Sequence, residues 1–165
     1  MQLNSVQLAI QLTLEDFNIF RQIEPTEYID YLFHLKSQYG TPALLSFSEL
    51  VNKEMFWVVT EVCSEHNLLK RSKIIKQFIK VARHCKEYKN FNSMFAILSG
   101  LGHCSVNRLK QTWEKLPKRY QRLFEDMQDL MDPSRNMSKY RNLINNDSVQ
   151  PPTVIFEFYY FLDTE

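Results

Sequence analysis

The residue types that most often carry covalent chemistry are scattered along this chain. The four histidines, His34, His66, His84 and His103, form no HExxH or other close metal-binding pair, and neither a GxSxG nor a P-loop motif occurs. His84 and Cys85 are adjacent, so on a helix their side chains point in different directions, which disfavours a Cys–His nucleophile. The sequence therefore argues against a hydrolase or a nucleotidase, and it predicts no metal site and no cofactor.

Charged residues recur at helical spacing in two segments. Glu125 and Asp129 stand at i and i+4, which on an amphipathic helix is ordinary surface chemistry and implies no acid–base pair. The other segment carries basic residues that form either a binding surface or the solvated face of a helix, and the near-neutral chain favours the solvated face. These residues are Lys73, Lys76, Lys80, Arg83 and Lys86.

The composition predicts one compact helical domain. Hydrophobic residues make up 44% of the 165 residues and aromatic residues 13%, too much for a disordered segment, and only 3 glycines argue against a turn-rich β fold. With 20 Lys and Arg against 19 Asp and Glu, the net charge of +1 predicts no long-range attraction to nucleic acid or to an anionic membrane. Partners should be recognised by shape and local chemistry.

Cysteine usage and hydropathy predict a cytosolic location. Cys63, Cys85 and Cys104 are odd in number, widely spaced and in no CxxC arrangement, so they suggest neither a disulfide framework nor a zinc site. The opening MQLNSVQLAIQL lacks the features of a signal peptide, and no segment approaches the ~20 apolar residues that cross a bilayer. We expect no insertion of this chain into a membrane.

Apolar periodicity and capping residues predict a series of helices. Thr13, followed three residues later by Asp16, is the expected start of the first helix, and small residues around Gly100 would let a neighbouring helix approach closely. The segment over 43–69 is expected to be a long central helix, either continuous or interrupted. The predicted helices cover 13–22, 25 to the break near 40–42, 43–69, 72–91, 92–101, 105–113, 117–131 and a last one around 137–144.

The last residues differ in character from the rest. PPTVIFEFYYFLDTE concentrates aromatic and aliphatic side chains in a short run, which fits a strand, a helix or an exposed apolar tail, and local pattern does not separate these.

One long motif resembles a known family. The string NFNSMFAILSGLGHCSVNRLKQTWEKLP, from Asn90 to Pro117, is similar to the signature of the CDC25-homology (RasGEF) domain of Ras-family exchange factors. The segments QLTLEDFNIFRQIEPTEYIDYLF and FWVVTEV before it and DPSRNMSKYRNLI and QPP after it resemble further family blocks, together covering Gln11 to Pro152. The resemblance implies an all-α, irregular helical bundle, with a partial RasGEF domain at 1–152 and a divergent aromatic tail at 153–165.

This resemblance also implies a function. IEPTEYIDYLF, FNSMFAILSGL and DPSRNMSKYR look most like Rap-directed exchangers that carry PDZ and Ras-association domains, whose other domains could recruit the parent protein to membranes. Members of this family form no covalent bond with the GTPase. One surface of the domain binds switch 2 of the GTPase, while a helical hairpin later in the chain displaces switch 1. TVIFEFYYFLDTE stands where the family continues toward that hairpin, so we expect the chain to be inactive alone. The alternatives are a non-catalytic GTPase-binding module or an unstable truncated isoform.

The resemblance places five residues on the switch-2 surface. Phe33 and Phe95 match positions for contact residues, but both also lie on apolar stripes and could be core. Glu49 could contact the GTPase or be solvated helix surface. Gly102 stands where the family commonly has an asparagine, and its alternative role is to end a helix. Asn107 stands where some members carry an aromatic residue.

Three further positions match the family signature closely. Asn92, Arg108 and Trp113 are expected to be structural, holding helices together through buried polar and aromatic contacts.

Overall fold

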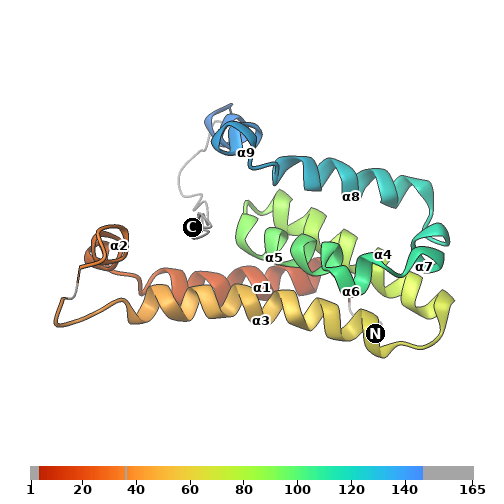
Figure 1. Cartoon of the computed structure of the whole chain (residues 1–165), viewed down its shortest axis with the longest axis horizontal. Helices are drawn as coiled ribbons and strands as arrows, with labels where there is room; N and C mark the ends of the chain where they lie inside the picture. Colours follow the sequence, from red (N-terminus) through yellow and green to blue (C-terminus); the bar gives the residue numbers. More distant parts are fainter. Residues whose placement is uncertain (1–3, 36, 147–165) are drawn as a thin grey trace.

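A computed structural model describes residues 4–35 and 37–146, and within these ranges all regular secondary structure is helical (Figure 1). The all-α prediction is confirmed. The helices are α1 (Ser5–Phe20), α2 (Pro25–Leu32), α3 (Pro42–Ser64), α4 (Leu68–Glu87), α5 (Phe91–Gly102), α6 (Cys104–Asn107), α7 (Lys110–Glu114), α8 (Lys118–Leu130) and α9 (Ser134–Asn146).

Helix α5 lies at the centre of the core. Every residue from Phe91 to Leu98 is buried, and a helix that is apolar around most of its circumference must be covered on all sides. Helices α3, α4, α1 and α8 supply this cover, with α1 and α3 side by side along one edge of the molecule and α8 along the opposite edge (Figure 1).

The contact between α3 and α5 depends on the absence of a side chain at Gly100. A Cβ atom built there would lie 2.7 Å from the backbone oxygen of Met55 and 2.8 Å from Cβ of Val58. The prediction that small residues in this segment allow close helix approach is therefore confirmed.

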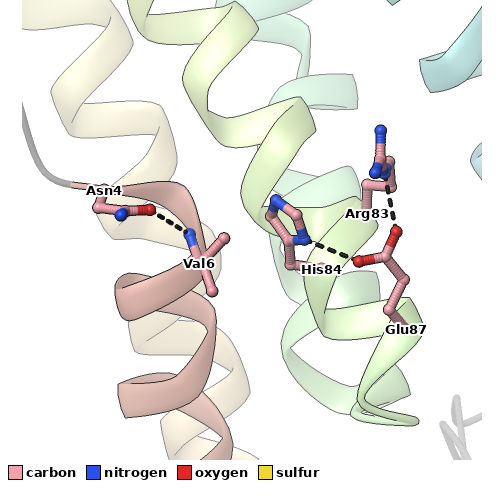
Figure 2. A network of polar contacts seen from close by, with 5 residues as sticks. All are labelled: Asn4, Val6, Arg83, His84 and Glu87. Atoms are coloured by element: carbon pink, nitrogen blue, oxygen red, sulfur yellow. Dashed lines mark hydrogen bonds and ion pairs between the residues drawn. The ribbon is translucent and has the colours of Figure 1, made fainter.

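The start of the first helix was predicted wrongly. Helix α1 begins at Ser5, because the Asn4 side chain accepts a hydrogen bond from the Val6 backbone N–H at 3.0 Å and so caps the helix (Figure 2). Thr13 is in mid-helix, where its Oγ1 donates to the backbone oxygen of Ala9 at 2.7 Å. The same hydroxyl that suggested a cap thus bonds to the preceding turn instead.

Two other boundaries differ from prediction, and one open alternative is decided. Helix α2 ends at Leu32, well before Gly40, because His34 turns the chain with a φ of 50°. Of the two alternatives for the helix over 43–69, the interrupted one is found: α3 ends at Ser64, and Asn67 accepts from the Lys70 N–H and caps α4. The helix predicted at 105–113 is divided into α6 and α7. Elsewhere α5, α8 and α9 lie within a few residues of prediction, although Arg135, Asn136 and Met137 have positive φ at the start of α9.

The aromatic tail predicted at 153–165 and the loop before it lie outside the described residues. Among the described helices, none is long and apolar enough to span a membrane.

Replacing Gly100 by alanine is expected to destabilise the fold by about 1–3 kcal/mol, because the added methyl group meets backbone and core atoms of α3 that cannot easily move. Urea or thermal denaturation followed by circular dichroism measures this effect. Gly102→Ala is the matched control, since its Cβ would meet only the flexible Gln128 side chain at 3.4 Å. Equal stability of the two variants would contradict the close packing at Gly100.

Candidate protein-binding surface

A groove of about 400 Å³ lies where α5 ends and the short helices α6 and α7 face α8. Its lining combines apolar, amide and charged groups. The lining residues are Leu101, Gly102, Asn107, Lys110, Trp113, Glu114, Gln121, Phe124, Glu125 and Gln128.

Side-chain contacts hold the walls of this groove in place. Trp113 donates from Nε1 to the backbone oxygen of Val106 at 3.2 Å, and its ring centroid lies 5.1 Å from that of Phe124 on α8. Gln121 Nε2 donates to the backbone oxygens of Trp113 and Leu116 at 2.9 and 2.8 Å. The segment α6–α7 is therefore fixed against α8, and the groove is preformed.

The outer face of α3 continues toward this groove. Glu49 and Phe56 are seven residues apart and so lie on the same face of the helix, where the Phe56 side chain is 53% exposed. The Phe56 ring centroid is 6.2 Å from that of His103, directly after the end of α5. A shallower hollow containing His103 shares Gly102 and Gln128 with the groove, so the two regions are continuous.

The five predicted contact residues occupy three different environments. Gly102 and Asn107 line the groove, and Glu49 is exposed on α3 with a 3.7 Å ion pair to Lys53. Phe33 is 68% exposed at the end of α2. Phe95 is 4% exposed, with its ring 5.3 Å from that of Tyr140. The structure thus brings Gly102 and Asn107 together, and it places Phe95 within the core of the described chain.

The three signature residues also differ in their surroundings. Asn92 is buried and donates from Nδ2 to Oδ1 of Asp16 at 3.2 Å. Trp113 is a partly buried wall of the groove. Arg108 is exposed, with Nε 3.4 Å from the backbone oxygen of Ser105 in its own turn.

Sequence reasoning missed Phe56, His103 and Gln128 as surface residues. A usable signal existed for Phe56, because it falls outside the apolar stripe formed by Val51, Val58 and their neighbours, and an aromatic side chain off that stripe is expected to be exposed. His103 and Gln128 gave no such signal, since their position depends on the docking of α8 against the end of α5.

The most strongly perturbed titratable groups lie in the core, where α1, α3 and α5 meet. Ser93 Oγ is 2.7 Å from Oδ2 of Asp16 and 3.1 Å from Oε1 of Glu54, and it accepts from Asn90 Nδ2 at 3.1 Å. A hydroxyl has one proton, so it donates to only one of the two carboxyl groups. The contact to the other requires a proton on that carboxyl.

Burial explains why one of these two carboxyl groups keeps its proton. Desolvation is the main cause that raises the pKa of Glu54 to about 9, and the neighbouring charge of Asp16 raises it further. Desolvation also raises the pKa of Asp16, although hydrogen bonds from Ser93, Asn90 and Asn92 oppose the shift. Glu54 is therefore the protonated member near neutral pH, with its proton directed at Ser93.

The neighbouring thiol is unsuited to nucleophilic chemistry. Cys85 is fully buried, and desolvation, followed by the charge of Glu54, raises the pKa of its thiol, which stays protonated. His84 is on a different side of α4, where Nδ1 donates to Oε2 of Glu87 at 2.8 Å. Within 4–35 and 37–146, no group of three metal-ligating side chains is clustered closely enough to hold an ion.

The described residues form an all-helical domain with a groove and an exposed aromatic side chain on its surface. The RasGEF domain model matches residues 7–163, so the chain belongs to the RasGEF-domain family, as its sequence motifs predicted. Human Rap guanine nucleotide exchange factor 6 is 56% identical over 154 residues, covering 93% of this chain and 10% of that protein. The Rap guanine nucleotide exchange factor of Caenorhabditis elegans is 51% identical with the same two coverages.

A more distant relative is human Rap guanine nucleotide exchange factor 5, which is 38% identical over 155 residues, or 93% of this chain and 26% of that protein. The chain thus spans between a tenth and about a quarter of the length of these relatives.

Stability should depend on pH through Glu54. Because its folded pKa is above the unfolded value of 4.5, the folded state binds the extra proton between 4.5 and about 9, and the free energy of unfolding falls across this window as pH rises. The slope reaches roughly 1.4 kcal/mol per pH unit. Glu54→Gln should remove most of this slope, leaving a contribution of the same sign from Asp16.

Urea denaturation across the window measures this slope, with Glu24→Gln, which removes an exposed carboxylate, as the control. An unchanged slope in the Glu54→Gln variant would show that Glu54 ionises in the folded protein as it does in the unfolded chain.

Proposed function

We propose that this chain supplies the GTPase-binding surface of a guanine-nucleotide exchange domain for a Ras-like small GTPase, and that the GTPase is Rap. The surface from Glu49 and Phe56 on α3, across His103, to the groove at Gly102 and Asn107 is the observation that supports this proposal. Membership of the RasGEF-domain family and the names of its Rap-directed relatives support the choice of partner.

Exchange of this kind requires binding energy and no covalent step. A surface that binds the nucleotide-free GTPase more tightly than the loaded form lowers the affinity of the GTPase for nucleotide by the same factor, because the two affinities are thermodynamically linked. The exposed groups on α3 and in the groove would contact the switch 2 region of the GTPase. Contacts that differ there between the nucleotide-free and the loaded GTPase would give the two states different affinities.

Individual residues have distinct roles in this proposal. Phe56, and Phe33 on α2, are exposed aromatic side chains of the kind that anchor protein interfaces. Glu49 presents a carboxylate that is held only by a weak surface ion pair and is free to exchange partners. Asn107 in the groove offers amide donors and acceptors. Phe95 would act only from the core, where its ring packs against those of Phe91 and Tyr140.

Calorimetry with nucleotide-free and GDP-loaded Rap tests the proposal, using the full chain. We expect tighter binding to nucleotide-free Rap and a loss of at least about tenfold in affinity for the double variant Glu49→Ala/Phe56→Ala. A matched control is Leu69→Ala/Tyr88→Ala, which removes one exposed side chain at the start of α4 and one directly after its end, and thermal melts confirm that each variant folds.

Two results would contradict this assignment. Absence of binding to either form of Rap would reject the partner, and equal losses in the two double variants would reject the surface. Release of a fluorescent guanine nucleotide, measured in parallel, separates exchange from binding: binding without faster release favours a non-catalytic GTPase-binding module.

A further inference from the structure

A second surface is built from basic side chains of α4 and α8. Lys70, Lys73, Lys76 and Lys80 line a cleft of about 370 Å³ beside α1, in which Glu65 is the single acidic lining residue. Their spacing of three or four residues places them along one side of α4 over roughly 15 Å of helix.

The Tyr120 ring joins this row to α8. Lys76 Nζ lies 4.8 Å from the ring centroid of Tyr120, and the Arg119 guanidinium carbon lies 5.2 Å from it. Arg122 follows Arg119 by three residues and is exposed beside it. We name this surface the basic face: Lys70, Lys73, Lys76, Lys80, Arg119 and Arg122.

The charges of the basic face are not neutralised by the protein. Among residues 4–35 and 37–146, none of its six side chains forms an ion pair. Arg83, one turn further along α4, is different: its Nε is 2.9 Å from Oε1 of Glu87, and the other carboxylate oxygen, Oε2, accepts from Nδ1 of His84 (Figure 2). Arg83 is therefore not counted as part of the basic face.

The net charge of the whole chain does not reveal this local concentration of basic residues. Residues 68–90 contain eight Lys or Arg and one acidic residue, a net of +7, so the rest of the chain must carry −6 to give the total of +1. A molecule polarised in this way is attracted to a negative surface and oriented by it, which the total alone would not predict.

The chemistry of the basic face favours a lipid surface over a protein or nucleic acid. Four of its six cations are lysines, which act as flexible point charges, whereas protein interfaces are anchored by exposed aromatic and arginine side chains. Its aromatic residue, Tyr120, is 9% exposed and already covered by Lys76 and Arg119, so it offers no platform for stacking bases. Four to eight clustered Lys and Arg on an amphipathic helix are typical of binding to anionic phospholipid.

We propose that the basic face binds the surface of membranes containing anionic phospholipid, without inserting into them. Each cation is attracted to the negative headgroups within about a Debye length, and the contributions accumulate over the six. This proposal does not depend on the GTPase partner, because its test involves neither GTPase nor nucleotide.

Vesicle flotation of the full chain tests the proposal, with vesicles of phosphatidylcholine alone and of phosphatidylcholine and phosphatidylserine in equal parts. We expect binding to the mixed vesicles that weakens with added salt. The variant Lys70→Gln/Lys73→Gln/Lys80→Gln should reduce the partition coefficient roughly a hundredfold. The control Arg21→Gln/Lys53→Gln/Arg141→Gln removes the same charge from other exposed positions and should retain most of the binding.

Three outcomes would overturn the proposal. Wild-type protein that binds both vesicle types equally, or neither, shows that anionic lipid is not the ligand. Equal losses in the two triple variants show that net charge, rather than the basic face, drives binding. Binding of the wild type to polyglutamate but not to vesicles assigns the face to an acidic protein. Circular dichroism melts of both variants exclude unfolding as the cause of a loss.

Discussion

The Ser93 hydroxyl holds α1, α3 and α5 together at a single buried point. It contacts Asp16 from α1 and Glu54 from α3. Because the hydroxyl has a single proton to donate, one of these two carboxyl groups must stay protonated. Removing any one of the three side chains would leave a buried polar group without its hydrogen bond. The cost of this unsatisfied group exceeds the net contribution of the hydrogen bond to the free energy of unfolding. The relative position of these helices is therefore specified by hydrogen-bond satisfaction as well as by apolar packing.

That constraint sets the direction of the outer face of α3. Ser93 and Gly100 are seven residues apart on the same face of α5, and they contact Glu54 and the Met55–Val58 turn of α3. With Glu54 turned inward, the helical repeat directs Glu49 and Phe56 outward, on the opposite side. The same helix thus buries its acid toward the core and exposes an acid and an aromatic side chain toward a partner, beside the groove at the end of α5.

Helical periodicity predicted most of the fold, because the apolar stripes of α3, α4, α5 and α8 are regular enough to decide their type. The predicted helix boundaries were wrong where one side chain can form either of two hydrogen bonds. Thr13 is an example, because its hydroxyl can cap a helix or bond to the preceding turn. The candidate surface was predicted in part. Gly102, Asn107 and Glu49 followed from family motifs, whereas the groove itself arises from the docking of α8, a long-range contact that no local pattern encodes. Glu54 also left a signal, since it is an acid at an apolar stripe position between Val51 and Val58.

Helix α8 separates the two surfaces of the molecule. Gln121, Phe124 and Gln128 face the groove, while Arg119 and Arg122 are on the other side of the same helix, with Arg119 over the ring of Tyr120. Because Tyr120 packs toward Lys76, the rotation of α8 about its own axis is fixed, and the groove and the basic face lie on different sides of this helix. A chain held by its basic face would therefore present the groove away from the contact. The distribution of charge could then orient the protein-binding surface without changing its affinity.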